Sequence, residues 1–344
     1  MKKLLKRISA ITAFFIGAAI IIAIAAVTAF AHFNNPPYMP DITAVQFEVH
    51  SGESARSVGR RLEEEGLIRN RFLWNMLSRF SNEHIKTGNY LIEAPATQMA
   101  IRQVLVSGRQ ILTRVTIPEG FTINRIAMLM DDAGICSFDD FISAAKNPDT
   151  AARYRIPGQS MEGYLFPDTY LFPSGFPAER VVETLADTFF SRVEAINEHA
   201  VNMSPEELKR IVILASIVER EYRMPEEAPI MAGVFINRLQ IGMSLQSCAT
   251  VEYIITEIMG RPHPRVLTYA DIAIRNPFNT YIHPGLPPHP ISAPGAIALR
   301  AAMFPAETEY LYFRLLEEHS GRHYFSRTFD EHIRAGQLFV RGRP

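Results

Sequence analysis

Cysteine and tryptophan are scarce in this sequence, and neither sign of charge dominates. The 344 residues include one tryptophan and two cysteines, Cys136 and Cys248, which lie far apart along the chain. This number excludes a disulfide framework and the separation gives no paired zinc motif, so we interpret both as packed thiols. The formal net charge is −1, which gives no electrostatic reason to expect nucleic acid as a partner.

The sequence also lacks the short motifs of several enzyme classes. It has no phosphate-binding loop, no G-x-S-x-G elbow and no H-E-x-x-H zinc helix. His283, His289, His323 and His332 have no metal-ligand spacing. We therefore predict neither a metal ion nor a cofactor. The length and the 47% hydrophobic content are ordinary for a globular protein of two or three domains.

No charged residue occurs from Ile8 to Ala31, directly after the basic tail MKKLLKR of residues 1–7. At about 1.5 Å per residue, a helix over 8–31 is about 36 Å long and crosses a hydrocarbon core of about 30 Å. Ala29-Phe30-Ala31 resembles a signal-peptidase site, but a signal core spans only about 7–15 residues. We expect an uncleaved, single-pass anchor in the cytoplasmic (inner) membrane. The basic tail then stays in the cytoplasm, a linker follows at 32–42, and the rest lies outside.

One pattern occurs twice after the linker. FEVHSGESARSVGRRL (47–62) and VTIPEGFTINRIAMLM (115–130) align without a gap, with Gly52 on Gly120 and Ser54 on Thr122. Each copy predicts a strand, a glycine turn, a capping residue and a helix. Between the copies we expect a helix near 70–79, a strand at 89–94 and a helix at 98–107. The first copy resembles a LysM module, a small fold that binds N-acetylated glycans, so we predict a LysM-like subdomain over 43–117. The alternative is a plain α+β domain with a local repeat.

A predicted helix from Pro205 to about Arg223 ends on an acid. Ser204 and Glu207 form a capping box, and residues 211–218 contain no ionisable group. Glu219 continues the apolar stripe, so burial and the helix C-terminus should both raise its pKa. Arg223 lies four positions on and could pair with Glu219 in a purely structural role. We expect Glu221, about half a turn away, to be solvated or paired.

Two segments rich in proline and aromatic residues, 162–173 and 276–295, cannot form long regular elements. They predict rigid loops lined by aromatic rings and amides, which suit a sugar-binding cleft. In order, six segments resemble the endolytic murein transglycosylase (YceG-like) family: EGYLFPDTY, LASIVERE, VFINRLQIGMSLQS, NPFNTYIHPGLPP, ISAPGAIALRAAMFPAETEYLYF and HYFSRTFDEH. The resemblance covers most of residues 40–335.

The resemblance implies an α+β fold, with a larger catalytic domain over 118–344 that cleaves the MurNAc–GlcNAc bond of nascent peptidoglycan strands. It identifies Glu219 as the catalytic acid, and peptidoglycan, the membrane and the cell-wall synthases of elongation as partners. As substrate contacts it implies Glu162, Tyr164, Asn237, Gln246, Asn279 and Tyr281. The sequence departs from the family pattern at Cys248, Ala249 and His289.

A single acid is enough for a lytic transglycosylase, because the C6 hydroxyl of the muramic acid closes on C1. Glu219 would protonate the glycosidic oxygen and then take the C6 proton, which leaves a 1,6-anhydro end and terminates the strand. Two alternatives remain open. One is a membrane-tethered glycan-binding scaffold without chemistry; the other is a muramidase that pairs Glu219 with Glu162 or Asp168.

Overall fold

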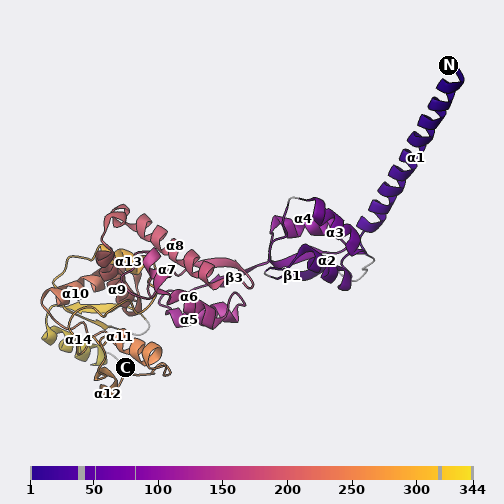
Figure 1. The fold of residues 1–344 in the computed structure, drawn as a ribbon. Coiled ribbons are helices and arrows are strands. Elements are labelled where there is room, and N and C mark those ends of the chain that lie inside the picture. Colours follow the sequence, from indigo (N-terminus) through magenta and orange to yellow (C-terminus); the bar gives the residue numbers. More distant parts are fainter. Residues whose placement is uncertain (1, 38–42, 51, 82, 317–319, 342–344) are drawn as a thin grey trace. The chain divides into compact units, whose positions relative to one another are not determined.

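The structure is a computed structural model, and it describes residues 2–37, 43–50, 52–81, 83–316 and 320–341. The chain forms two compact units, Met1–Leu112 and Thr113–Pro344 (Figure 1). Helices dominate both units, and within the described residues the strands form three two-stranded sheets, β1–β2, β3–β4 and β5–β6. The chain is therefore α+β, as the sequence predicts.

The first unit is a βααβ arrangement with an additional helix before and after it. The two strands pair antiparallel, with Phe47 opposite Tyr90. Its elements are α1 (Lys2–Asn34), β1 (Ala44–Val49), α2 (Ala55–Glu64), α3 (Arg71–Phe80), β2 (Gly88–Glu93) and α4 (Gln98–Ser107). Its core surrounds Trp74, the one tryptophan, which is fully buried and donates from Nε1 to the Ala55 carbonyl at 2.8 Å.

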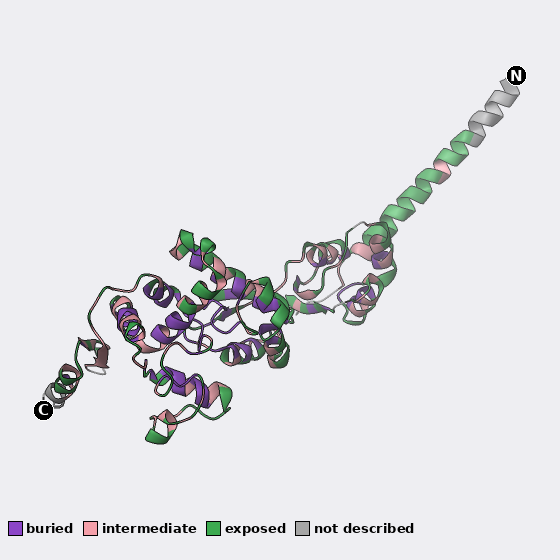
Figure 2. Ribbon diagram, turned by 60° about the vertical axis from the view of Figure 1, so that its left-hand side comes forward, coloured by how far each residue is buried: buried purple, intermediate pink, exposed green. Residues whose placement is uncertain are grey.

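α1 is apolar and unburied. The stretch Thr12–Asn34 has a mean hydropathy of 2.6, and none of it is buried inside the protein. Phe14, Phe15 and Ile21 are each at least 66% exposed, and Figure 2 shows the helix in the colour of exposed residues over most of its described length. Length and composition fit a membrane span, and a signal sequence passes the same test. The helix ends at Asn34, beyond the predicted 8–31, and residues 38–42 of the predicted linker lie outside the described residues.

The repeat predicted from the sequence is present in the backbone. Gly52 and Gly120 have φ values of +73° and +74°, in the left-handed region that favours glycine. Ser54 caps α2 and Thr122 caps α5, each by accepting a backbone N–H three residues on. The two copies therefore share strand, turn and cap.

The second unit is built around α9, and α8, α10 and α13 lie in the same helical body (Figure 1). The helices are α5 (Ile123–Asp132), α6 (Phe138–Ala145), α7 (Pro148–Arg153), α8 (Ala178–Ile196), α9 (Pro205–Glu221), α10 (Ala228–Gln240), α11 (Cys248–Tyr253), α12 (Tyr269–Ile272), α13 (Ala296–Met303) and α14 (Phe329–Arg341). Short helical turns are η1 (Glu198–Asn202), η2 (Pro225–Glu227) and η3 (Ile254–Ile258), and the strands are β3 (Leu112–Thr116), β4 (Thr169–Pro173), β5 (Tyr312–Leu315) and β6 (His323–Ser326).

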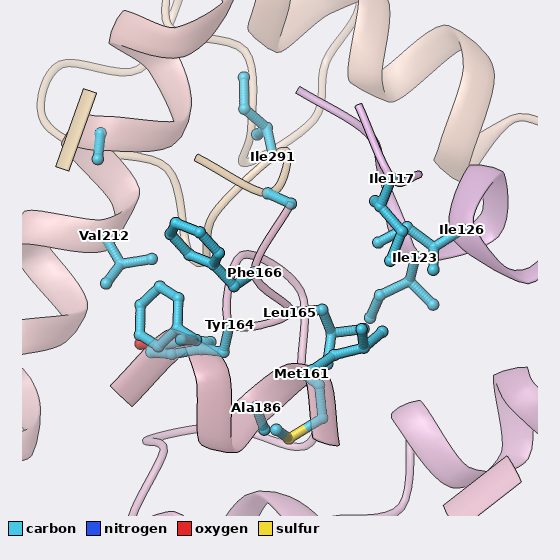
Figure 3. Packing of buried hydrophobic residues seen from close by; sticks show 14 of the residues in the cluster. Ile117, Ile123, Ile126, Met161, Tyr164, Leu165, Phe166, Ala186, Val212 and Ile291 are labelled. Atoms are coloured by element: carbon cyan, nitrogen blue, oxygen red, sulfur yellow. The ribbon is translucent and has the colours of Figure 1, made fainter. Parts of the chain in front are cut away.

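The EGYLFPDTY loop forms part of this core. Figure 3 shows Tyr164, Leu165 and Phe166 among the buried side chains, with Tyr164 near Val212 of α9. Gly163 has φ +85°, and a Cβ at this position would lie 2.3 Å from Cβ of Pro290. Glycine is needed here both for the backbone conformation and for this close approach. The loop therefore holds the Pro290 segment against α9.

We predict that Gly163→Ala destabilises the protein by more than about 2 kcal/mol, since the new methyl group meets both left-handed strain and Pro290. The matched control is Gly175→Ala, where φ is also positive (+68°) but no atom lies within 4 Å. That variant should lose only about 1 kcal/mol. Denaturant titration of both variants checks the difference, and equal losses would contradict the packing role of Gly163.

Candidate active site

α9 carries Glu219 to the edge of the core. The helix begins with the predicted capping box, in which Ser204 accepts from Glu207 N and the Glu207 side chain accepts from Ser204 N. Residues Val212–Val218 are all buried, and the next residue, Glu219, is only half-buried. The helix ends at Glu221, two residues before the predicted Arg223, and Tyr222 is its C-cap. Glu219 therefore lies where an apolar helix emerges from the protein.

The segment 291–295 is fastened along this end of α9. The Ser216 hydroxyl accepts from Ile291 N at 3.0 Å, and the Ser292 hydroxyl donates to the Ser216 carbonyl at 3.1 Å. Three residues later in the helix, Glu219 Oε2 accepts from Gly295 N at 2.9 Å. Ser216 and Ser292 are fully buried, so this connection is shielded from water. It fixes one oxygen of the Glu219 carboxyl group.

The environment of Glu219 favours its neutral form. Burial raises its pKa to about 8, and the Gly295 N–H opposes this shift because it stabilises the anion. The negative charge of Glu119 adds to the rise, while Tyr222 and the Arg220 guanidinium lower the pKa. Because the net result lies above neutral, most Glu219 side chains carry a proton at pH 7. A protonated carboxyl group with one oxygen fixed can act as a general acid.

Glu119 is a neighbour that the sequence reasoning missed. It belongs to the IPEGFT segment after β3, where Gly120 N donates to the Ala293 carbonyl at 2.9 Å and Ala293 N donates to the Phe121 carbonyl at 2.7 Å. These two hydrogen bonds place Glu119 next to Gly295. One feature of the sequence could have indicated Glu119: in the second copy of the repeat it directly precedes the turn glycine, Gly120.

The arginine predicted to pair with Glu219 does not do so. The ion pairs of the described residues do not include one between Glu219 and Arg223, and Arg223 is exposed. Arg220 instead pairs with Glu252 of α11 at 2.9 Å. Arg223 is the residue after the C-cap Tyr222, so it lies outside the helix. It therefore lacks the helical spacing that would place it next to Glu219. The purely structural Glu219–Arg223 pair is therefore not formed.

Glu221 differs in part from its prediction. It is half-buried rather than solvated, and its Oε1 accepts from the Ser247 hydroxyl at 2.5 Å. Burial raises its pKa, and the Ser247 hydrogen bond opposes that rise. It is thus a second perturbed acid on α9, although its partner on the N-cap of α11 is a framework residue that is itself buried.

Two predicted substrate contacts in the EGYLFPDTY loop have framework positions. Glu162 is 6% exposed and accepts from Ile123 N, the first residue of α5, at 3.2 Å. Burial raises its pKa to about 8. Tyr164 is 2% exposed and packs edge-on against Phe189. Such burial argues against direct contact with a substrate, and we assign both residues to the framework that supports α9.

Asn279 and Asn237 are also engaged by the backbone. Asn279 is fully buried, and its amide donates to the carbonyls of Ile272 and Ile274 at 2.9 and 2.8 Å. The Asn237 amide donates to the carbonyls of Thr308 and Tyr310 at 2.8 and 3.0 Å. Both amides therefore hold loops in place. The sequence alone could not distinguish loop closure from sugar binding, because an asparagine amide can serve either role.

Gln246 and Tyr281 remain accessible. Gln246 is exposed and has φ +52°, a strained value for a residue with a side chain. Tyr281 is half-buried, and its hydroxyl lies 3.1 Å from Sγ of Cys248. Both flank Ser247, the partner of Glu221, so they lie at the end of α9 that carries Glu219.

Two of the three departures from the family pattern fit into the framework. Ala249 is 3% exposed, whereas Cys248, predicted to be a packed thiol, is exposed beside Tyr281. His289 packs edge-on against Phe278 with ring centroids 4.5 Å apart. Its burial lowers its pKa, so the neutral ring is favoured. Within the described part of the chain, no group of three or more His, Cys, Asp or Glu side chains is arranged to hold a metal ion.

Glu219→Gln should stabilise the protein, and the gain should depend on pH. The folded state keeps the Glu219 proton up to about pH 8, whereas an unfolded glutamate loses it near 4.5. The contribution of the Glu219 proton to the stability of the native protein is thus complete below pH 4.5, and it is lost as the pH rises toward 8. We expect Glu219→Gln to exceed the native protein by about 1–3 kcal/mol at pH 8, and by less at pH 4.5.

The measurement is the free energy of unfolding from denaturant titration at several pH values. Glu206→Gln, an exposed position at the other end of α9, is the control and should show no such pH-dependent gain. A Glu219→Gln gain that did not grow between pH 4.5 and 8 would contradict the assigned environment.

Comparison with known proteins gives consistent results. The YceG-like family profile matches residues 47–337. The endolytic murein transglycosylase of Bacillus subtilis is 29% identical over 87% of this chain and 85% of its own length. The protein of the same name from Streptococcus pneumoniae is 26% identical over 83% of this chain and 56% of its own. A crystal structure of a YceG-like protein from Listeria monocytogenes matches with a TM-score of 0.57 and 27% identity, over 86% of this chain and 99% of that one. The chain therefore belongs to the YceG-like family.

Proposed function

We propose that this protein is a peptidoglycan lytic transglycosylase that cuts nascent glycan strands internally, leaves 1,6-anhydro-MurNAc ends and so terminates strand elongation. The observation that carries the proposal is Glu219: a half-buried carboxyl at the end of an apolar helix, fixed by Gly295 N at 2.9 Å, with a pKa of about 8. Two relatives that share most of this chain bear the name endolytic murein transglycosylase.

The proposed reaction uses Glu219 twice. As the acid it donates its proton to the glycosidic oxygen while the bond from C1 of MurNAc to that oxygen breaks, which frees the GlcNAc hydroxyl. The C6 hydroxyl of the same MurNAc then bonds to C1, and its proton passes to the Glu219 carboxylate. The acid is regenerated, no water is consumed, and no cofactor is needed.

The protonation state suits this order of events. A general acid works best when its pKa lies close to the working pH, because it must hold a proton yet release it readily. At about 8, the pKa of Glu219 meets this condition near neutrality. After donation, the Gly295 N–H stabilises the carboxylate long enough for it to accept the C6 proton.

The alternatives are less well supported. A glycan-binding scaffold without chemistry gives no reason for a desolvated acid at the end of α9. A two-carboxylate muramidase with Glu162 or Asp168 would need one of them beside Glu219. Glu162 is instead bound to Ile123 N, and Asp168 pairs with Arg192 at 3.0 Å. The reducing end of the product separates hydrolysis from transglycosylation.

The location that we propose is the outer face of the cytoplasmic membrane, with α1 as a single-pass anchor. The apolar, unburied stretch of α1 and the basic residues before it support this. The LysM-like subdomain that we propose over residues 43–117, which contains the βααβ arrangement, would hold the strand, and residues 118–344 would cut it. Cell-wall synthases of elongation are the partners that such a position suggests.

Glu219→Gln should lower the rate of anhydro-muropeptide formation by about 10⁴-fold or more, because general acid–base catalysis typically contributes about 10²- to 10⁴-fold and one group serves both steps. Glu221→Gln should cost far less, since its amide can still accept from Ser247. The assay is mass spectrometry of products from uncrosslinked strands and purified, folded variants. Near-native release of anhydro ends by Glu219→Gln would refute the assignment, and free reducing ends would indicate hydrolysis.

The orientation of the chain can be tested in cells. With residues 1–7 inside, a C-terminal fusion to a reporter that is active only in the cytoplasm should be inactive, and one that is active only outside should work. Sequencing of the mature N-terminus is the companion measurement. A start near His32 would show a cleaved signal, and an active cytoplasmic reporter would reverse the proposed topology.

A further inference from the structure

A second carboxylate lies beside Glu219, and the proposed reaction does not use it. A Cβ built on Gly295 would lie 1.9 Å from Oε1 of Glu119, while the N–H of the same glycine donates to Glu219 Oε2 at 2.9 Å. With ordinary bond lengths within Gly295, these distances place the two carboxylates within about 7 Å of each other. Glycine at 295 thus lets two acids approach one residue from different sides.

We propose that Glu119 is a positioning residue for the acid: its negative charge keeps the proton on Glu219 at neutral pH until the glycosidic oxygen receives it. The inference rests on the proposed function, because it assigns Glu119 a role through Glu219. Like charges within about 7 Å of each other disfavour ionising both groups, so Glu219 holds its proton more tightly beside a charged Glu119 than without it.

The backbone fixes the position of Glu119. Gly120 and Phe121 pair with Ala293 through two hydrogen bonds, and Gly120 takes a left-handed conformation at φ +74°. The same turn leads directly into the Thr122 cap of α5. Glu119 therefore meets Gly295 because two chain segments are joined there. Its side chain is exposed, whereas Glu219 is half-buried, so Glu119 is the more accessible of the two acids.

The other groups near Glu219 cannot take this role. Tyr222 and Arg220 both lower the pKa of Glu219. Arg220 is held by Glu252, which also lies 3.3 Å from His263 Nε2.

Another cation, Arg125, stacks on Phe121 at 3.9 Å from the ring centroid. Its guanidinium lies close enough to Arg220 for their charges to interact, but it is not among the groups that act on Glu219. Among the charges that do act on Glu219, Glu119 is the one whose removal should lower its pKa.

The test is an infrared titration of the full-length protein in detergent. The protonated-carboxyl band of Glu219 is identified by its absence from Glu219→Gln. We expect Glu119→Gln, which keeps the shape and removes the charge, to lower the titration midpoint by about one pH unit, equivalent to about tenfold in proton affinity. The control Glu206→Gln, at the far end of α9, should titrate as the native protein does. An unchanged midpoint in Glu119→Gln would overturn the proposal.

Activity gives a second readout. The alkaline limb of the rate of anhydro-end formation should move to lower pH in Glu119→Gln, so its loss of rate should be larger at pH 8 than at pH 5. If Glu219→Gln is inactive and the limb of Glu119→Gln stays in place, the role of Glu119 is wrong and the proposed function stands. If Glu219→Gln still forms anhydro ends, the proposed function fails and this inference fails with it.

The contact itself is tested by a double-mutant cycle. Gly295→Ala should lower activity, because its methyl group would displace the Glu119 carboxylate, the end of an exposed side chain, from its place beside Glu219. In a Glu119→Ala background that space is free, so the same substitution should cost at least fivefold less in activity than in the native background. Equal costs in the two backgrounds would show that Gly295 does not serve this contact.

Discussion

The structure of the site depends on one constraint, the fastening of segment 291–295 along the last two turns of α9. Ser216 is buried. Its hydroxyl accepts a hydrogen bond from Ile291 N, and its carbonyl accepts one from the Ser292 hydroxyl. These polar groups have no water to replace their partners, so separating the segment from the helix would leave them unsatisfied. The Gly295–Glu219 hydrogen bond is the outer end of the same connection. The catalytic candidate therefore owes its orientation to framework hydrogen bonds that begin in the core.

The acidity and accessibility of Glu219 follow from its place at the outer end of this hydrogen-bonded connection. One turn deeper, at Ser216, a carboxyl group would be fully enclosed and could not reach a sugar. Past the end of the helix, at Arg223, the chain is exposed, and a carboxyl group there would be solvated. Glu219 lies between these limits, half-buried and fixed at one oxygen, and burial raises its pKa to about 8. The position along a single helix thus sets both access and acidity.

The sequence predicted what is local and missed what depends on contacts between distant segments. The capping box of α9, the caps at Ser54 and Thr122, and the glycine turns of the repeat all involve residues within a few positions of one another. The acid at Glu219 was predictable because its apolar stripe is local too. Glu119 was not, since it reaches the site only when the turn after β3 pairs with Ala293, far along the chain. The predicted pairing of Arg223 with Glu219 was wrong because α9 ends before Arg223.

The motif residues Tyr164 and Asn279 show why the family pattern was easier to recognise than to interpret. A loop rich in proline and aromatic residues must bury its rings and satisfy its backbone. Here Tyr164 packs against Phe189 of α8, and the Asn279 amide satisfies two carbonyls beside the NPFNTY turn. An amide or ring that closes a loop is as specific in sequence as one that binds a sugar. Burial helps to separate the two roles, and the low exposure of Tyr164 (2%) and Asn279 (0%) favours the role of closing a loop. Gln246 is exposed and Tyr281 half-buried near the end of α9, so both stay candidates for recognition of the strand, while the buried motif residues hold α9 in place.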